Sequence, residues 1–133
     1  MQAQPAIIVA AINESPLNRG LIGEEWCADP SNIPIIAGSD VTLFDGEGAG
    51  VYQAHLLYKS RGRAAILRLK EAVAEMFAMH GAQLIFALVP DFRKDAAFVA
   101  RSVGGKFVGK RNTLYGKCDL FVLSKEMWEG LPA

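Results

Sequence analysis

The most regular hydrophobic pattern in the chain lies in the middle of the sequence. Apolar side chains recur there at intervals of three and four residues, at Ala65, Ile66, Leu69, Val73, Met76 and Phe77. This spacing predicts a helix with one buried face, and His80-Gly81 can end it. The apolar run AQLIFALV, residues 82–89, follows at once and stops at Pro90. Such an unbroken run is typical of a strand buried on both faces.

Weaker patterns predict the elements on the N-terminal side of this helix. Pro5 can open a short helix that runs to about Asn13, because proline is tolerated at the first helical position. Residues 14–34 hold three prolines and two glycines with little periodicity, which indicates an irregular segment. Residues 33–45 then predict one or two short strands and residues 50–58 another, with the glycine-rich DGEGAG as the turn between them.

On the C-terminal side, Asp91 is a candidate cap for a second helix, which Gly104-Gly105 would end. Residues 106–111 and 118–125 flank the turn-like LYGK and predict a terminal hairpin. Strand, helix, strand, helix and hairpin indicate an α/β fold whose first crossover joins parallel strands. With 133 residues, half of them apolar, we expect one domain, residues 1–133.

The charges are unevenly divided, although the net charge is zero. Residues 1–50 contain one basic and seven acidic residues, a balance of −6, and the rest of the chain carries +6. A basic second part suits an anionic ligand, because clustered cations raise the local concentration of anions. Solvated surfaces that differ by chance would give the same division.

Cysteine content and hydropathy argue against a metal protein, a membrane protein and a secreted protein. Cys27 and Cys118 are too few and too isolated for a metal cluster, so no metal is expected. The N-terminal run AIIVAAI is too short to span a bilayer and lacks the basic lead-in of a secretion signal. We therefore expect a soluble, cytoplasmic protein without a membrane partner.

The turn KSRGR, residues 59–63, carries the clearest candidate chemistry. It joins a strand directly to the long helix, so several backbone N–H groups would point at one spot before the positive helix end. Gly62 permits close approach of the backbone, while Lys59, Arg61 and Arg63 add charge and donors. These features indicate a phosphate site, although a solvated loop or a contact to nucleic acid phosphates would use the same residues.

From residue 41 to residue 124, the order of elements resembles the coenzyme A-binding core of the GNAT N-acetyltransferase superfamily, especially its small phage-borne members. The segments that carry the resemblance are GVYQAHLLY, SRGRAA, LIFALVP and LFVLSK. In that family, backbone amides in a turn of the form [QR]-x-x-G-x-[GA] hold the pyrophosphate of acetyl-CoA. Here the pattern fits in two registers, one from Lys59 to Ala64 and one from Arg61 to Ile66.

The resemblance implies a mixed central sheet with splayed parallel strands and helices on both faces. Acetyl-CoA would be the cofactor, with its pantetheine arm between the splayed strands. A backbone N–H near Leu56 or Leu57 would donate to the acetyl carbonyl, as in an oxyanion hole. The residues implied for cofactor binding are Leu56, Leu57, Tyr58, Lys59, Ser60, Arg61, Gly62, Arg63, Ala64, Ala65 and Lys94.

The resemblance also implies direct attack by an amine, which needs a base and an acid rather than a nucleophile. His55 is the candidate base, because imidazole titrates near neutral pH. Tyr58 and Tyr115 are candidate acids, and each of the three could instead be a packing residue. Many active members carry a tyrosine in the second helix, and this chain has VAR, residues 99–101, near its place.

Three interpretations are therefore open. The first is an acetyl-CoA-dependent N-acetyltransferase that acts on an unidentified small-molecule or protein amine. The second is a catalytically silent GNAT-like protein with a phage structural or host-interaction role, which the missing tyrosine favours. The third is a nucleic-acid-binding module, which the lack of aromatic residues among the basic ones disfavours. A homodimer formed through the terminal strands is compatible with each interpretation.

Overall fold

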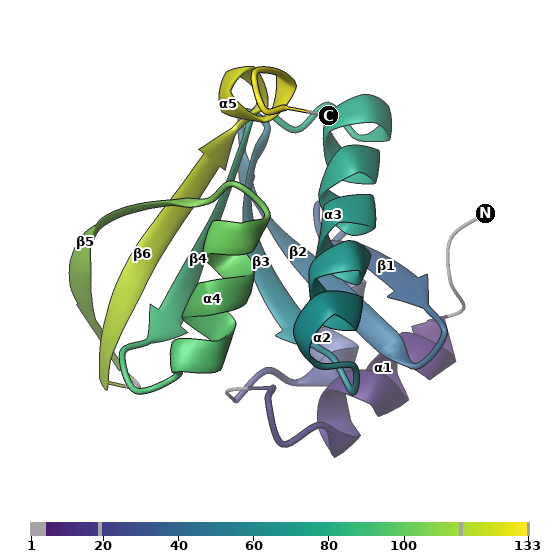
Figure 1. Ribbon diagram of the computed structural model, residues 1–133. Helices are drawn as coiled ribbons and strands as arrows, with labels where there is room; N and C mark the ends of the chain where they lie inside the picture. Colours follow the sequence, from purple (N-terminus) through teal and green to yellow (C-terminus); the bar gives the residue numbers. More distant parts are fainter. Residues whose placement is uncertain (1–4, 19, 115, 133) are drawn as a thin grey trace.

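The computed structural model describes residues 5–18, 20–114 and 116–132 (Figure 1). Within these residues, six strands form one mixed sheet in the order β1-β2-β3-β4-β6-β5. The strands are β1 (Ile33–Ala37), β2 (Asp40–Gly48), β3 (Val51–Leu57), β4 (Leu84–Pro90), β5 (Lys106–Thr113) and β6 (Gly116–Ser124). The helices are α1 (Pro5–Glu14), α2 (Gly23–Ala28), α3 (Gly62–Met79), α4 (Lys94–Ser102) and α5 (Lys125–Glu129). β3 and β4 run parallel, and the other pairs of neighbouring strands run antiparallel.

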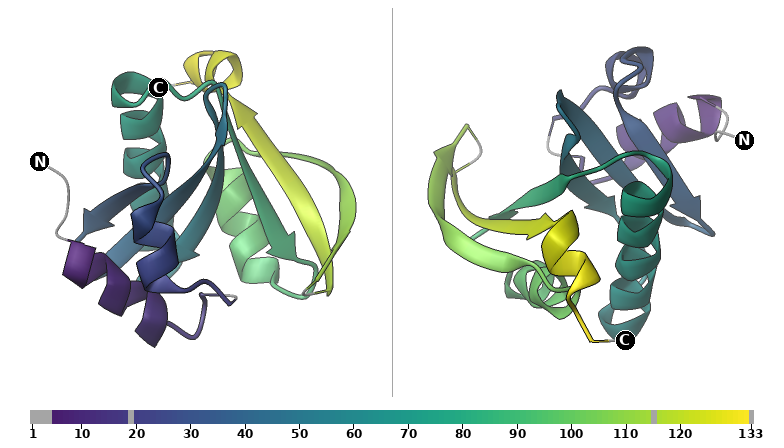
Figure 2. Two further views of the ribbon diagram at one scale, coloured as in Figure 1. Left: turned by 180° about the vertical axis from the view of Figure 1, so that it is seen from behind. Right: turned by 90° about the horizontal axis from the view of Figure 1, so that it is seen from above.

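Helices cover both faces of the sheet. α3 and α4 lie on one face, and α1 and α2 lie on the other, as the front and back views show (Figures 1 and 2). Strand β2 feeds both cores, because successive side chains of a strand point to opposite faces. Its Leu43 packs with Ile8 and Ile12 of α1, whereas Phe44 packs with Met76 of α3. The predicted α/β architecture with helices on both faces is confirmed.

The predicted long helix is present as α3, which spans Gly62–Met79. Its buried residues are Ala65, Leu69, Ala72, Val73, Met76 and Phe77, which fall on one face as the spacing predicts. Each large side chain among them contributes about 2–5 kcal/mol relative to alanine, so the packing of this face fixes α3 against the sheet. The position of the N-terminus of α3 is therefore well determined.

The two shortest helices, α2 and α5, were not predicted. α2 lies inside the segment that we expected to be irregular, and α5 follows β6, where Ser124 Oγ accepts a hydrogen bond of 3.0 Å from Met127 N. α4 begins at Lys94 rather than at Asp91, so the prediction of Asp91 as a cap was wrong. The Asp91 N–H donates instead to the Lys117 carbonyl, because the chain still follows the sheet there.

The parallel strands β3 and β4 separate along their length. They pair from Val51 opposite Leu84 to Gln53 opposite Phe86, and the ladder ends there although both strands continue. β3 stays paired with β2 as far as Leu57, and β4 stays paired with β6 to its end, so each strand follows its outer neighbour. Figure 1 shows the two strands diverging toward the start of α3. The predicted splay is confirmed.

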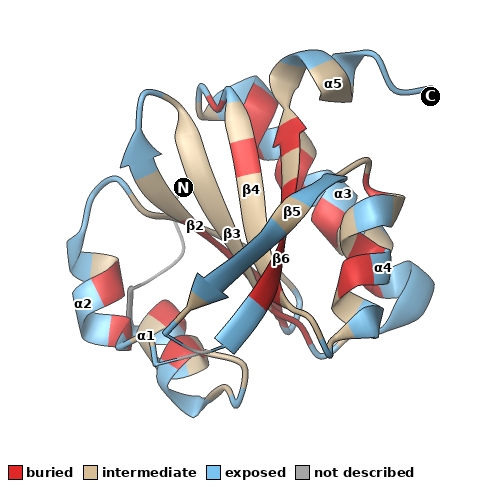
Figure 3. Cartoon of the chain, turned by 90° about the vertical axis from the view of Figure 1, so that its left-hand side faces the viewer, coloured by how far each residue is buried: buried red, intermediate tan, exposed pale blue. Residues whose placement is uncertain are grey.

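β5 forms one edge of the sheet, and most of its side chains are exposed (Figure 3). Lys106 and Lys110 are among them, and charged side chains of this kind keep an edge strand from pairing with other chains. Among the described residues, no helix has the length and apolar character that a membrane crossing requires.

Candidate functional site

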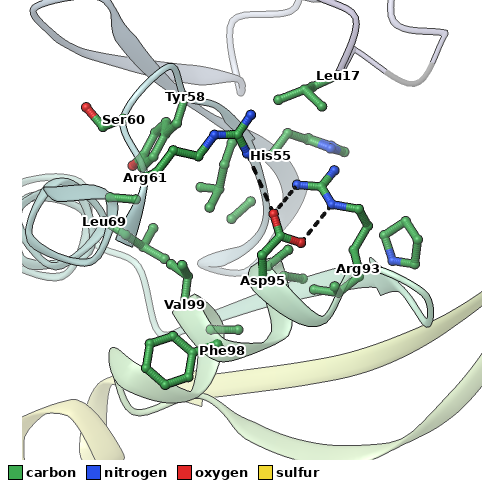
Figure 4. Close-up of a pocket in the computed structure, with 18 of the residues that line it drawn as sticks. Leu17, His55, Tyr58, Ser60, Arg61, Leu69, Arg93, Asp95, Phe98 and Val99 are labelled. Carbon is green, nitrogen blue, oxygen red and sulfur yellow. Dashed lines mark hydrogen bonds and ion pairs between the residues drawn. The ribbon is translucent and has the colours of Figure 1, made fainter. Parts of the chain in front are cut away.

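A cleft of about 510 Å³ opens where β3 and β4 separate. Its walls come from the ends of both strands, the first turns of α3, the cleft side of α4 and the loop between α1 and α2 (Figure 4). Leu69 of α3 lines it from one face of the sheet, and Leu17 of the α1–α2 loop lines it from the other. The cleft therefore passes through the sheet, which the missing β3–β4 pairing allows.

The turn before α3 is held by a buried carboxylate. Asp40 Oδ1 accepts hydrogen bonds from Lys59 N at 2.8 Å and from Ser60 N at 3.0 Å, and Asp40 is only 3% exposed. Burial by itself raises the pKa of Asp40, but these hydrogen bonds and the nearby Arg68 outweigh it, so the pKa is lowered. The amides of Lys59 and Ser60 thus face Asp40, whereas we expected them to face a ligand.

The amides that remain available belong to the first turn of α3. Gly62, Arg63 and Ala64 come before the first internal hydrogen bonds of the helix, and the cap residue Arg61 makes no side-chain hydrogen bond to any described amide there. Gly62 has a φ of +58°, and an added Cβ would meet no described atom within 4 Å. Glycine is thus needed for the backbone conformation, and the space in front of it is open.

Three charged side chains meet at one end of the cleft, here called the mouth. Arg93 Nε and Nη2 donate to the two carboxylate oxygens of Asp95 at 3.0 and 3.1 Å. Arg61 Nη1 lies 3.7 Å from Asp95 Oδ2, so Asp95 lies between two guanidinium groups (Figure 4). The hydrogen bonds from Arg93 lower the pKa of Asp95 to about 2. The two guanidinium groups at the mouth can therefore bind an anion, and in this structure they contact the carboxylate of Asp95.

His55 lines the cleft and belongs to an unpredicted chain of hydrogen bonds. Its Nε2 lies 2.7 Å from Asp45 Oδ2, and Asp45 Oδ1 accepts the indole N–H of Trp26. In the β2–β3 register Leu43 is opposite His55, which places Asp45 on the same face as a diagonal neighbour. Sequence reasoning missed both partners, because the register of the hairpin was not known and the position of α2 was not predicted.

Other predicted site residues lie in less favourable places. Tyr58 lines the cleft, but its hydroxyl shares a hydrogen bond with Thr42, and burial raises its pKa to about 12. A phenol of this kind suits packing better than proton donation. Leu57 is buried on the face of the sheet that α1 and α2 cover. Tyr115 lies outside the described residues.

Apart from Leu57, the predicted cofactor-binding residues divide into two groups. Those that line the cleft are Leu56, Tyr58, Ser60, Arg61, Gly62 and Ala65. Lys59, Arg63, Ala64 and Lys94 are exposed outside it. The exposed cations can still contribute charge near the mouth, because electrostatic attraction of an anion does not require direct contact.

Beyond Asp95, the residues of α4 that line the cleft are apolar. Val99 and Ala100 line the cleft, as Ala96 does one turn earlier. Arg101 points elsewhere, with its guanidinium carbon 5.3 Å from the centroid of the Phe121 ring. Of the three residues near the place of the family tyrosine, two therefore face the cleft, and neither carries an acid. No group of His, Cys, Asp or Glu side chains in the described part of the chain is placed to hold a metal ion.

Neither the family models nor the curated protein sequences give a match to this chain. Solved structures do match. Aminoglycoside acetyltransferase AAC(6')-Ib in complex with coenzyme A and kanamycin is 16% identical, with a TM-score of 0.69, and the match covers 97% of this chain and 95% of that one. The ribosomal-protein-S5-alanine acetyltransferase of Vibrio fischeri is 10% identical, with a TM-score of 0.68, over 96% of this chain and 93% of that one.

A third neighbour is the Campylobacter jejuni N-acetyltransferase PseH in complex with acetyl coenzyme A. It is 10% identical with a TM-score of 0.62, over 77% of this chain and 74% of that one. At such low identity these likenesses show the fold and leave the chemistry to the residues of the site. They do not bear on the phage-borne members of the family, so that finer assignment stays a prediction. The chain has the GNAT-like α/β fold, an open mixed sheet with helices on both sides.

Proposed function

We propose that this protein is an acetyl-CoA-dependent N-acetyltransferase that acts on an amine. The observation that carries the proposal is the cleft between β3 and β4, which connects the open N-terminus of α3 with His55. Neighbours of the same fold have been solved with coenzyme A or acetyl coenzyme A, and one of these also with kanamycin, an amine. The acceptor of this chain is unidentified, and a small-molecule amine and a protein amine are both candidates.

In this proposal the cleft holds coenzyme A. The diphosphate would meet the amides of Gly62, Arg63 and Ala64 and the positive end of the α3 dipole, with Arg61 beside it. The pantetheine arm is a long and weakly polar chain, which suits the apolar walls that β4 and α4 supply. Backbone groups of β3 beyond Gln53 have left the ladder with β4, so they can pair with the amides of the arm.

His55 is the base in this proposal. Acetyl-CoA supplies the acetyl group as a thioester. The amine nitrogen forms a bond to the carbonyl carbon as the carbon–sulfur bond breaks, the proton of the amine passes to His55, and the departing thiolate takes a proton from water. A backbone N–H near Leu56 stabilises the charge on the carbonyl oxygen. No covalent link to the protein is required.

Coenzyme A binding tests the first half of the proposal. In Gly62→Asp a carboxylate would stand where the diphosphate is expected, so the stabilisation of the protein by coenzyme A in a thermal shift titration should be lost. Gly81→Asp is the matched control, because Gly81 lies beyond the other end of α3, also with positive φ and with no described atom near its added Cβ. Undiminished affinity in Gly62→Asp would refute the phosphate site.

Release of free thiol from acetyl-CoA, measured over a panel of amines, tests the second half. A catalytically silent GNAT-like protein is the second candidate, because Val99 and Ala100 stand on the cleft side of α4 where many active members have a tyrosine. Tight binding of coenzyme A without thiol release for any amine, small or peptidic, would favour this candidate and a structural or host-interaction role. Thiol release that requires an amine would establish the enzyme.

A further inference from the structure

The hydrogen bonds around Asp45 have an arrangement that fixes which nitrogen of His55 is free. Asp45 uses one carboxylate oxygen for His55 Nε2, at 2.7 Å, and the other for the indole N–H of Trp26. An ionised carboxylate can only accept hydrogen bonds, so a neutral His55 must carry its proton on Nε2. Nδ1 then holds the lone pair, and no described residue contacts it as a hydrogen-bond partner. His55 lines the cleft, where this lone pair could accept a proton from a bound amine.

Trp26 is itself held firmly. It is 6% exposed and packs with Ile8, Ile12 and Leu43 between α1 and the sheet. Its indole nitrogen can donate but cannot accept, so the atom of residue 45 that faces Trp26 must be an acceptor. The side chain of Asp45 is thereby also held through the carboxylate oxygen that His55 does not contact.

We propose that Asp45 and Trp26 are positioning residues that set the tautomer of His55 for proton abstraction from the acceptor amine. The catalytic consequence rests on the proposed function, whereas the tautomer itself does not. Among the described residues, the charged side chains that line the same cleft are Arg61, Arg93 and Asp95, and both arginines contact Asp95 at the mouth. Of the charged groups that the structure describes, Asp45 is the one in direct contact with the imidazole.

Asp45→Asn should change the tautomer of His55. The indole N–H of Trp26 would recruit the amide oxygen of the new asparagine, which leaves the NH₂ group to face His55. Nε2 would then have to accept a hydrogen bond, the proton would move to Nδ1, and the lone pair would be lost from the cleft. In Asp45→Asn/Trp26→Phe the indole donor is gone, so the asparagine can turn its oxygen to His55 and restore the original tautomer.

Nitrogen-15 NMR of the imidazole groups reads the tautomer directly, without any need for turnover. The chain has two histidines, and His55→Gln assigns the signals. We expect Nε2–H in the wild type, Nδ1–H in Asp45→Asn and a return toward Nε2–H in the double variant. The wild type alone is decisive if a variant fails to fold, because an Nδ1–H tautomer in it would overturn the inference.

Kinetics with an acceptor that turns over gives the second measurement. Asp45→Asn should lower kcat by about a hundredfold, the scale of a lost general base, with the affinity for coenzyme A unchanged. Trp26→Phe should have a small effect, and the double variant should be faster than Asp45→Asn alone. The control is Glu47→Gln, which removes an exposed carboxylate from the same strand. A double variant as slow as Asp45→Asn would contradict the inference, whereas failure to bind coenzyme A would count against the proposed function only.

Discussion

At the scale of single residues, we expect Asp95 to affect stability and ligand binding in opposite directions. Its pKa is lowered to about 2 in the folded protein, from an ordinary value of 3.8. The lowered pKa stabilises the fold above about pH 4, and this contribution disappears as the pH falls through 2. Because Asp95 is largely exposed, Asp95→Asn should cost less than about 1 kcal/mol at pH 7 and almost nothing at pH 2 in urea titrations.

The same change should tighten the binding of coenzyme A by about threefold to tenfold, because it removes a negative charge from the mouth and releases Arg61 and Arg93. Glu126→Gln is the matched control, since Glu126 is the acidic residue in the first turn of another helix, α5. Calorimetric titration at low ionic strength measures the difference. Weaker binding in Asp95→Asn would show that the two arginines need Asp95 to hold them in place.

Local chemistry explains which site residues could be predicted from the sequence. The turn around Gly62 is a contiguous motif, so its basic residues and its glycine could be recognised together in the sequence. Asp40 and Asp45 could not be assigned in this way, because they act on groups that are 10 to 20 residues away in the chain. Their partners are fixed by the register of β2 against β3, which depends on the whole hairpin.

At the scale of elements, the cleft side of α4 allows a test of whether an added acid would speed turnover. Ala100 faces the cleft, and Ala100→Tyr would place a phenol in a position from which it could protonate the departing thiolate. Ala100→Phe has nearly the same bulk without the hydroxyl and is the matched control. We expect kcat to be several-fold higher in Ala100→Tyr than in Ala100→Phe when thiol release is followed at saturating acetyl-CoA. Equal rates in both variants would show that proton donation at this place does not limit turnover.

The length of an element decided whether its pattern could be read. α3 has 18 residues and a regular buried face, so its existence and its ends were predicted closely. α2 has six residues and α5 has five, too few to show a helical period, and Pro16 and Gly20 precede α2. Their positions depend on packing against distant elements rather than on local propensity.

At the scale of the whole molecule, the two faces of the sheet have different tasks in the proposed function. The face with α3 and α4 holds the phosphate turn and the apolar wall of the cleft, and the face with α1 and α2 holds Trp26 and Asp45. His55 stands between them, where the sheet is open. Changes that disturb α2 should therefore lower turnover while coenzyme A still binds.

Gly23→Ala tests this division. Gly23 is buried at the start of α2, and an added Cβ would lie 2.6 Å from the carbonyl oxygen of Val9 in α1, so α2 must move away. We expect a loss of about 1–3 kcal/mol in stability, typical of overpacking, and a lower kcat, because Trp26 moves with α2. The affinity for coenzyme A should stay within twofold of the wild type.

Gly130→Ala is the control, since its added Cβ meets its nearest atom at 3.5 Å, and it should leave stability, kcat and affinity unchanged. Loss of coenzyme A binding in Gly23→Ala, at a temperature where the variant is folded, would mean that the two faces are not independent and that α2 supports the phosphate turn as well.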